Sequence, residues 1–583
     1  MTHTFTVWAP GRSRVELVMG NRRLPMVRAE HGWWEAADAA VQAGAGTRYG
    51  FALDGGETRP DPRSASQPDG VLGLSEVVDH EAHTWTDADW PGLSIAGSVL
   101  YELHVGTFSP AGTFDGVIER LPHLVELGVD AIELMPVAEF SGKRGWGYDG
   151  VDLFAPHHSY GGPAGLKRLV DACHAHGLGA ALDVVYNHLG PVGNFLSEFG
   201  PYFSDRHATA WGEAFNFDGP GRDEVRRFIV DNALMWIRDY HFDGLRLDAV
   251  HTIDDESTIH ILEQLAMEVG ALGDELHRTT FLVAESDAND PRLVRSRDAG
   301  GYGFDGVWSD DWHHSLHGAL TGERGGYYQD FGSLEQLGKA LRQAWVYDGV
   351  WSARRQRTRG EKATGVAPHS FVIAAQTHDQ VGNRAAGERL AALVDEGSLK
   401  VAAALLLLSP FTPMLFQGEE WASSSPFLYF TDHSDPEVGK AVRDGRRREF
   451  AAFGWDPDQM SDPQEASTFE RSRLSWDELD EPFHRRILDW YRALIALRKR
   501  LPASPNAVDV GVHVAVDENR RRIEFARDGI SAWVNLGRDD WQLRLPRGAH
   551  LLLASDPTVR PSDDAFCVRP SSVAIFEIPK AIG

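Results

Sequence analysis

Four short stretches of the chain follow apolar runs and carry carboxylate or imidazole side chains. They are DVVYNH at 183–188, GLRLDAVH at 244–251, AES at 284–286 and THDQ at 377–380. Cleavage of a glycosidic bond needs one carboxylate that attacks or activates water, and one carboxylic acid that protonates the leaving oxygen. Asp248 and Glu285 have suitable side chains for these two roles. The four stretches therefore predict sugar hydrolysis, provided that the fold brings them together.

The residues around this pair support the same chemistry. Alternation along an extended strand places Arg246 and Asp248 on one face. An arginine beside an aspartate keeps the carboxylate ionised and oriented, which suits a nucleophile. A third carboxylate, Asp379, would raise the pKa of the acid by like-charge repulsion and could bind sugar hydroxyls. Asp183 lies inside its apolar run, so we expect it to be a buried partner of Arg246 or of a backbone group.

Eight apolar segments can position these residues. Parallel strands that alternate with helices form a barrel when there are eight of them, and the working residues then sit at the carboxyl ends of the strands. The segments between the third and fourth strands and between the sixth and seventh are long, so we expect loops over the functional face. The eight candidate strands are 99–105, 131–137, 179–186, 244–250, 281–285, 306–309, 371–376 and 413–416.

The rest of the chain predicts two flanking β domains. Short alternating runs broken by Gly and Pro indicate a β-sandwich at residues 1–93. We expect the catalytic (β/α)8 TIM barrel at 94–502 and a C-terminal β domain at 503–583, so the fold class is α/β. Helices are predicted at Val117–Leu127, which Gly128 ends, and at Phe483–Lys499. The apolar stretch Val401–Leu408 is far shorter than the roughly 20 residues of a membrane span and predicts a buried helix.

Composition restricts the class of partner. The chain has 583 residues and a formal net charge of -28. An acidic surface repels phosphates, so we expect no nucleic-acid partner and no anionic membrane, and a neutral α-glucan fits better. The basic cluster Arg446, Arg447 and Arg448 does not reverse this balance. The composition indicates nothing about oligomeric state.

The two cysteines and the start of the chain favour a cytoplasmic protein. Cys173 and Cys567 are far apart in the sequence, so no disulfide framework is predicted. The opening residues, MTHTFTVWAP, lack the charged start and apolar run of a signal peptide.

In order and spacing, the four stretches resemble the signature regions of the α-amylase family of glycoside hydrolases. The resemblance covers nearly the whole chain and implies double displacement with retention, without a cofactor or a catalytic metal. By position it implies that Asp248 is the nucleophile, Glu285 the acid/base and Asp379 the transition-state stabiliser. Residues implied to hold the sugar or the nucleophile are Tyr148, in GWGYDG, and His188, Arg246 and His378.

Within the family, two segments most resemble members that release trehalose from the end of maltooligosyltrehalose. These are WSDDWHHSLHGALTGERGGYY at 308–328 and QTHDQVGNRAAGER at 376–389. A Lys-His pair often follows the nucleophile in amylases, whereas Val250, His251 and Thr252 occupy this region here. The alternative function is another α-glucan enzyme, either debranching or branching. Further substrate-binding residues implied by this resemblance are His251, Asp311, Trp312, His314 and Tyr328.

Some of these residues permit other interpretations. The cluster His313, His314 and His317 has helical spacing that a metal could use, but a sugar-binding or packing role is favoured. A hydrogen bond is favoured over calcium binding for Asn187. Three tryptophans beside the motifs could equally stack on sugars or pack in the core: Trp146, Trp308 and Trp312.

Two other classes of protein fit the sequence less well. A metal-dependent barrel hydrolase using His188, His378 and Asp379 would leave Glu285 without a role. A non-catalytic glucan-binding protein on the same barrel should have lost at least one carboxylate, yet Asp248, Glu285 and Asp379 are all present.

Overall fold

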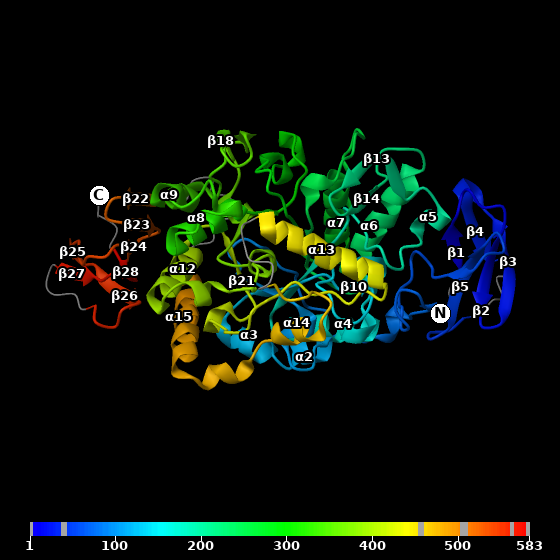
Figure 1. Ribbon diagram of the computed structural model, residues 1–583, viewed down its shortest axis with the longest axis horizontal. Coiled ribbons are helices and arrows are strands. Elements are labelled where there is room, and N and C mark those ends of the chain that lie inside the picture. The colour runs from blue at the N-terminus through cyan, green and yellow to red at the C-terminus, as the bar shows by residue number, and fades with distance from the viewer. Residues whose placement is uncertain (1–3, 37–42, 453–459, 502–510, 560–564, 579–583) are drawn as a thin grey trace.

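A computed structural model of the chain describes residues 4–36, 43–452, 460–501, 511–559 and 565–578. Figure 1 shows three regions along the longest axis. The strands of the N-terminal region lie at one end, those of the C-terminal region lie at the other, and the barrel with its helices lies between them. The predicted boundary at 502/503 lies outside the described residues. The other domain boundaries stay predictions.

The central region is a closed barrel of eight parallel strands, as predicted. Each strand falls within or overlaps its predicted segment. The barrel strands are β8 (Leu100–Leu103), β9 (Ala131–Leu134), β12 (Gly179–Val184), β15 (Gly244–Leu247), β16 (Phe281–Ala284), β17 (Gly306–Trp308), β20 (Phe371–Ala374) and β21 (Thr412–Phe416). Hydrogen bonds continue beyond two adjacent strands, because Asp248 N–H donates to the Val184 carbonyl and Glu285 N–H to the Leu247 carbonyl. Both carboxylates therefore follow directly the carboxyl ends of β15 and β16.

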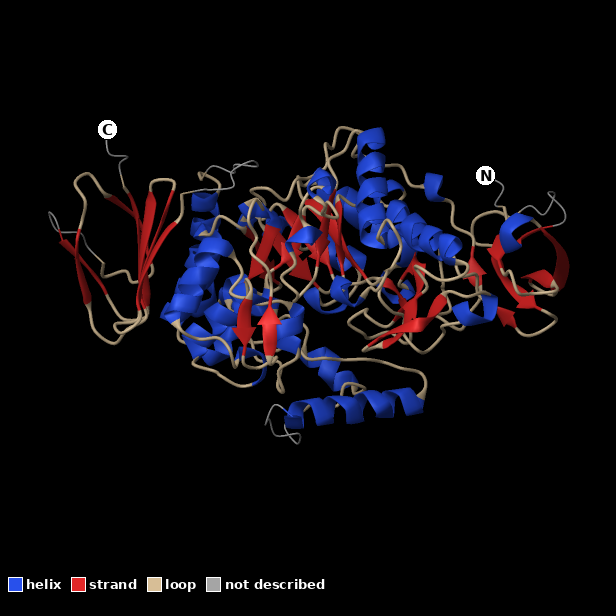
Figure 2. Ribbon diagram, turned by 90° about the horizontal axis from the view of Figure 1, so that it is seen from above, coloured by secondary structure: helices blue, strands red, loops and turns tan. Residues whose placement is uncertain are grey.

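Helices cover the outside of this barrel (Figure 2). The main ones are α4 (Gly162–Ala175), α6 (Arg222–Arg238), α7 (Ile261–Leu276), α8 (Asp310–Thr321), α9 (Leu334–Gln343), α12 (Glu396–Leu408), α13 (Pro436–Ala452) and α15 (Pro482–Arg498). The predicted helix at 401–408 is confirmed as part of α12, and the one predicted at 483–499 corresponds to α15, which ends at Arg498. No helix among the described residues is long and apolar enough to cross a membrane.

The predicted single helix Val117–Leu127 is wrong. The structure has α2 (Phe114–Ile118) and then α3 (Leu121–Leu127). Pro122 occupies the first turn of α3. Proline lacks an N–H group and disfavours a helical residue before it, so a new helix starts there. Gly128 ends α3, as expected, with the left-handed φ of 94° that glycine tolerates best.

The two long segments of the barrel build hairpins over its carboxyl-terminal face, as expected. The segment after β12 contains β13 (Phe203–Thr209) and β14 (Gly212–Phe215), and the segment after β17 contains β18 (Val350–Ser352) and β19 (Arg357–Arg359). Each pair is antiparallel. These segments therefore add the walls beside the predicted site.

Antiparallel sheets form both flanking regions. The N-terminal sheet runs β1-β4-β3-β2-β5-β6, with β7 also beside β5. Its strands are β1 (Thr6–Trp8), β2 (Val15–Met19), β3 (Arg22–Arg28), β4 (Trp33–Ala36), β5 (Arg48–Leu53), β6 (Thr58–Arg59) and β7 (Ser75–Glu76). The C-terminal region has a five-stranded sheet, β22-β23-β24-β28-β26, and a separate pair, β25-β27. Its strands are β22 (His513–Asp517), β23 (Arg522–Arg527), β24 (Ile530–Asn535), β25 (Trp541–Arg544), β26 (His550–Ala554), β27 (Ala565–Val568) and β28 (Ser572–Glu577).

Candidate active site

Arg246 lies at the centre of the predicted site and is fully buried. Its Nη1 donates to both carboxylate oxygens of Asp183 at 2.7 Å and to Oδ1 of Asp248 at 3.1 Å. Its Nη2 lies 2.9 Å from Oε2 of Glu285. One guanidinium therefore contacts three carboxylates that come from three neighbouring strands. Because a buried charge is costly unless it is paired, this arrangement fixes both ends of the guanidinium.

Asp248 is held at both carboxylate oxygens. Oδ1 accepts from Arg246, and Oδ2 accepts from Nδ2 of Asn187 at 3.0 Å. Asn187 Oδ1 is in turn 2.6 Å from Nδ1 of His188. These contacts hold the carboxylate in one orientation beside the positive charge of Arg246. They also agree with the hydrogen-bonding role favoured for Asn187.

Glu285 is anchored by a backbone turn. Ala249, directly after Asp248, has a left-handed φ of 40°, and its N–H donates to Oε2 of Glu285 at 2.8 Å. Such a conformation is uncommon for a residue with a Cβ, and the surrounding structure must stabilise it. Burial, with help from the charge of Asp248, raises the pKa of Glu285 although Arg246 opposes this. A raised pKa suits a group that must deliver a proton.

His378 connects the site to the first barrel strand. Nδ1 of His378 lies 2.5 Å from Oε1 of Glu102, and the backbone N–H of His378 donates to Oε2 at 2.9 Å. Burial alone would lower the pKa of His378, but the Glu102 carboxylate outweighs it and raises the pKa to about 9. Nε2 lies 2.8 Å from the hydroxyl of Tyr148, which donates to Asp183 at 2.5 Å. A protonated His378 therefore orients Tyr148 through a defined chain of donors.

Asp379 is more exposed than Asp248 and Glu285. It is exposed and lies in the first turn of the short helix α10 (His378–Gly382). Its Oδ1 accepts from Nδ2 of Asn383 at 2.6 Å. Desolvation by the surrounding protein raises the pKa of Asp379, while the positive charge of His378 opposes this rise.

Three residues predicted on the trehalose side have buried side chains, and their contact with substrate stays a prediction. Asp311 Oδ2 accepts from Asn289 Nδ2 at 2.8 Å and from the N–H groups of Val346 and Tyr347 at 2.7 Å. Trp312 has no exposed surface. The Tyr328 hydroxyl lies 3.1 Å from Nε2 of His313. Helix α8 turns Asp311 and Trp312 towards its packing partners, and Tyr328, on the 3-10 turn at Gly326–Tyr328, stacks on His317 of that helix at 4.2 Å.

The other two residues predicted there remain accessible. His314 is half-buried, and its ring is parallel to that of Tyr327 at a centroid distance of 6.2 Å. His251 is exposed, and its Nε2 lies 3.9 Å from Oδ1 of Asp287. Both can still present polar atoms to a ligand.

The histidine cluster on α8 is engaged by protein groups. His313 Nδ1 lies 2.7 Å from the Ala375 carbonyl, and His317 Nε2 lies 2.8 Å from Glu323 Oε2. This agrees with the packing role favoured for these rings.

A different trio has donor atoms within 4.8 Å of one another, namely Glu139, His157 and His158. However, His157 Nδ1 accepts from the Ser159 N–H at 3.1 Å. The proton of the neutral ring is then on Nε2, which is the atom that would have to bind a metal. This arrangement disfavours a metal there.

The tryptophans beside the motifs pack against protein. Trp146 is stacked on Phe427 and donates from Nε1 to the Leu428 carbonyl at 2.9 Å. Trp308 is buried, with the guanidinium carbon of Arg246 4.2 Å from its ring centroid. With Trp312 also buried, all three are core residues.

Four other residues near the site were not in the predicted set. Glu102 is a charged residue inside an apolar strand, which is a usable signal of an inward-facing role. Asn383 follows Asp379 by four residues, one helical turn away. Asp310 lies in the electrostatic reach of Glu285 and Asp379, and burial together with their charges raises its pKa. Trp211, on the turn between β13 and β14, is 55% exposed and stacks on His188 at 5.5 Å.

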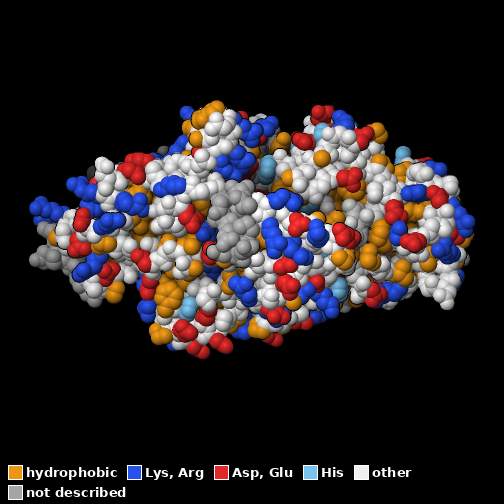
Figure 3. All heavy atoms as spheres, in the orientation of Figure 1, with side chains coloured by type: hydrophobic (Ala, Val, Ile, Leu, Met, Phe, Trp, Pro, Cys, Tyr) orange, Lys and Arg blue, Asp and Glu red, His pale blue; other side chains and the backbone are white. Residues whose placement is uncertain are grey.

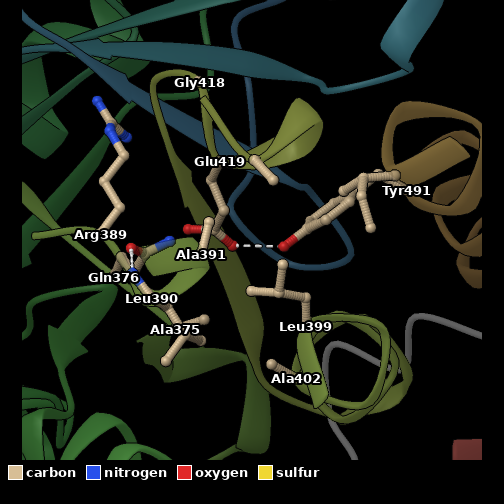
Figure 4. Close-up of a pocket in the computed structure, with 12 residues that line it drawn as sticks. Ala375, Gln376, Arg389, Leu390, Ala391, Leu399, Ala402, Gly418, Glu419 and Tyr491 are labelled. Atoms are coloured by element: carbon tan, nitrogen blue, oxygen red, sulfur yellow. Dashed lines mark hydrogen bonds between the residues drawn. The ribbon is translucent and has the colours of Figure 1, made fainter. Parts of the chain in front are cut away.

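A pocket elsewhere is unconnected with these residues. Figure 4 shows that it lies beside β21, α12 and α15, with Glu419 and Tyr491 joined by a 2.9 Å hydrogen bond. Its lining is mostly aliphatic, and none of the predicted site residues is part of it. Burial raises the pKa of Glu419 to about 8. The pocket is a packing feature of the barrel's outer layer.

The chain is similar to known proteins in both sequence and fold. The alpha amylase catalytic domain family matches residues 65–205. The chain is 50% identical over 539 residues to Malto-oligosyltrehalose trehalohydrolase from Arthrobacter ramosus, covering 92% of this chain and 93% of that one. It is 47% identical over 498 residues to the protein of the same name from Saccharolobus solfataricus, covering 85% of each. The chain belongs to the malto-oligosyltrehalose trehalohydrolase family.

Membership in the malto-oligosyltrehalose trehalohydrolase family makes the chain a glycoside hydrolase of the α-amylase type. A crystal structure of a candidate alpha amylase from Salmonella typhimurium matches it with a TM-score of 0.89 and 37% identity, covering 98% of this chain and 97% of that one. A pullulanase from Paenibacillus barengoltzii has a TM-score of 0.74 at 21% identity, covering 99% and 93%, and shares the fold.

Proposed function

We propose that this chain hydrolyses the α-1,4-glucosidic bond next to the trehalose end of maltooligosyltrehalose, releasing trehalose and a maltooligosaccharide. The observation that carries this proposal is the 50% identity, over nearly the whole chain, to a protein named for that activity. Its support in the structure is the contact of Asp248 and Glu285 with one guanidinium.

The reaction then runs in two displacements. In the first, Asp248 attacks the anomeric carbon while the protonated carboxyl of Glu285 gives its proton to the leaving trehalose oxygen. In the second, Glu285 takes a proton from water, and this water releases the sugar from Asp248. The buried Arg246 orients Asp248 for the attack, and Asp379 stabilises the positive charge that develops on the sugar.

The residues around the pair would bind the sugar. Tyr148 offers an aromatic face to the ring being cleaved, and His188 and His378 lie beside it. The exposed ring of Trp211 extends this surface. His251 and His314 stay as proposed contacts on the trehalose side. We assign a supporting role to Asp311, Trp312 and Tyr328, because their side chains are buried beneath the proposed trehalose side of the site.

Product chromatography tests the proposal. Maltotriosyltrehalose should yield trehalose and maltotriose at least about tenfold more efficiently, in kcat/KM, than maltopentaose is cleaved at any bond, because a site built for specific hydroxyls discriminates by leaving its polar groups unpaired. The Asp248→Asn variant, run in parallel, controls for contaminating hydrolases. Equal rates on the two substrates, or release of glucose and maltose, would contradict the proposal. Debranching or transfer products from a branched glucan would favour the alternative function.

A second experiment compares variants of an accessible and a buried candidate residue. His314→Ala should narrow the ratio of kcat/KM between maltotriosyltrehalose and maltopentaose, since this ring is accessible beside the cleavage site. Asp311→Ala should instead lower the unfolding temperature and leave the ratio within about twofold, because the variant loses three buried hydrogen bonds. A narrowed ratio in Asp311→Ala alone would restore that residue to the substrate side.

A further inference from the structure

The basic cluster at 446–448 lies on α13, which crosses one side of the barrel (Figures 1 and 2). Figure 3 shows Lys and Arg side chains gathered along this helix. The members of the cluster differ in their surroundings: Arg447 and Arg448 are exposed, whereas Arg446 is half-buried. The first of the three arginines therefore has a different role from the other two.

Arg446 contacts the protein on three sides. Its Nη1 donates to Oδ1 of Asn383 at 2.7 Å, and its Nη2 donates to the carbonyl of Gly382 at 3.2 Å. The carbon of its guanidinium group lies 4.5 Å from the ring centroid of Tyr429. Tyr429 meets the edge of Trp146 at 5.0 Å. These contacts fix the guanidinium in one orientation at the rim of the site.

The contact with Arg446 determines how Asn383 is oriented. An amide side chain carries a donor at one end and an acceptor at the other, whereas a guanidinium can only donate. Oδ1 of Asn383 must therefore face Arg446, which leaves Nδ2 to donate to Oδ1 of Asp379 at 2.6 Å. With the amide reversed, an oxygen would face the Asp379 carboxylate and both contacts would be lost.

We propose that Arg446 is a positioning residue for Asp379, which it orients through the side chain of Asn383. This inference rests on the proposed function, in which Asp379 stabilises the transition state. Asp379 needs such support because it is exposed and lies on a helix of five residues. The relay thus couples α13, more than sixty residues later in the chain, to the chemistry.

The position of α13 is itself fixed. Arg443, one turn before Arg446, forms a 2.8 Å ion pair with Asp462. Gly439 lies against Gln464, and a Cβ at this position would come within 2.3 Å of the Gln464 amide nitrogen. Gln464 Oε1 accepts from the Thr431 hydroxyl at 2.6 Å. Arg446 is therefore presented by an anchored helix.

Charged groups from several elements act on Asp379, and they set the sign of the pH test. His378, Arg246 and Arg446 lower its pKa, whereas Glu285 raises it. Asp310 adds a further negative charge nearby. Removing the Arg446 charge should raise the pKa of Asp379 further. Since Asp379 acts as a carboxylate, the acidic limb of the kcat/KM profile should then move to higher pH.

The experiment compares Arg446→Met with Arg447→Met, a matched variant of an exposed neighbour. Arg446→Met should lower kcat by about tenfold or more with KM within about threefold, and should move the acidic limb upwards by about half a pH unit or more. Arg447→Met should match wild type in kcat, in KM and in the position of the acidic limb. Arg446→Lys should recover much of the loss, because lysine restores a donor and a charge.

A double-mutant cycle with Asn383→Ala separates a relay from general destabilisation. If Arg446 orients Asp379 through Asn383, then Arg446→Met should lower kcat only slightly in the Asn383→Ala background, whereas independent effects on kcat would add. Additive losses, or an unshifted acidic limb, would overturn the proposal. If Arg446→Met does not fold, the test rests on Asn383→Ala, which should by itself move the acidic limb of the kcat/KM profile to higher pH. An unshifted limb in Asn383→Ala would then overturn the proposal. A failure of the proposed function would appear separately, in the products of the wild-type protein.

Discussion

Asp183 receives two 2.7 Å hydrogen bonds from Nη1 of Arg246, one at each carboxylate oxygen, in the buried interior of the barrel. The position of Asp183 inside its strand predicts a partner that is either Arg246 or a backbone group, and the structure has Arg246. The pair is almost fully screened from water, with side-chain exposures of 1% for Arg246 and 2% for Asp183. Asp183 therefore fixes the position of Arg246, and the other contacts of Arg246 hold Asp248 and Glu285.

Replacing the proposed nucleophile should abolish turnover and leave the fold intact. In Asp248→Asn, kcat should fall by at least about a thousandfold, roughly 4 kcal/mol of barrier, because an amide cannot form the glycosyl ester. The measurement is trehalose release from maltotriosyltrehalose, with the unfolding temperature as the control for folding. Activity within tenfold of wild type would remove Asp248 from this role.

Replacing the proposed acid should affect substrates according to their leaving groups. Glu285→Gln should disable cleavage of natural glucans, yet it should spare the first step on a glycosyl fluoride, since fluoride departs with little protonation. The measurement is fluoride release compared with trehalose release in the same preparation. Equal impairment on both substrates would show that Glu285 does not act as the acid.

The ion pair of His378 and Glu102 predicts a pH-dependent stability. The pKa of His378 is raised to about 9 in the folded protein, against an ordinary value near 6.5. Protonated His378 therefore contributes about 3 kcal/mol to the free energy of unfolding. This contribution is fully present below pH 6.5 and is lost as the pH rises through about 9. Denaturant unfolding between pH 6 and 9.5 should show a fall in wild-type stability that His378→Gln lacks. Parallel curves for the two proteins would contradict this prediction.

Chelation should have little effect on activity. Exhaustive treatment with a chelator should leave trehalose release within about twofold, because two carboxylates and a third stabilising one suffice for an oxocarbenium-like transition state. The control is the same treatment followed by added zinc or calcium. Complete loss that zinc restores would revive a metal role for the histidine clusters, and restoration by calcium would revive one for Asn187.

The sequence by itself determined the barrel and the central chemical groups. Eight apolar runs predicted eight strands, because a strand buried on both faces must be apolar along its length. Polar residues at the ends of such runs must lie at the carboxyl-terminal face of the barrel, which gathers Asp248, Glu285 and Asp379 in one place. The burial of Asp183 followed from its position inside an apolar strand. These features depend on the two-residue period of a strand, which is a property of nearby residues.

Only the tertiary structure decided which residues beyond the strands face the site. Helix α8 mixes polar and aromatic residues around its circumference, so its sequence does not distinguish the side that packs from the side that faces the cleft. Packing buried Asp311, Trp312 and Tyr328 and left His314 accessible. Similarly, no local pattern links Arg446 to Asn383, because the two meet only after α13 packs against the loop that follows α10. Contacts between residues far apart in the chain depend on how the elements pack, and the periodicity of a single segment does not encode that packing.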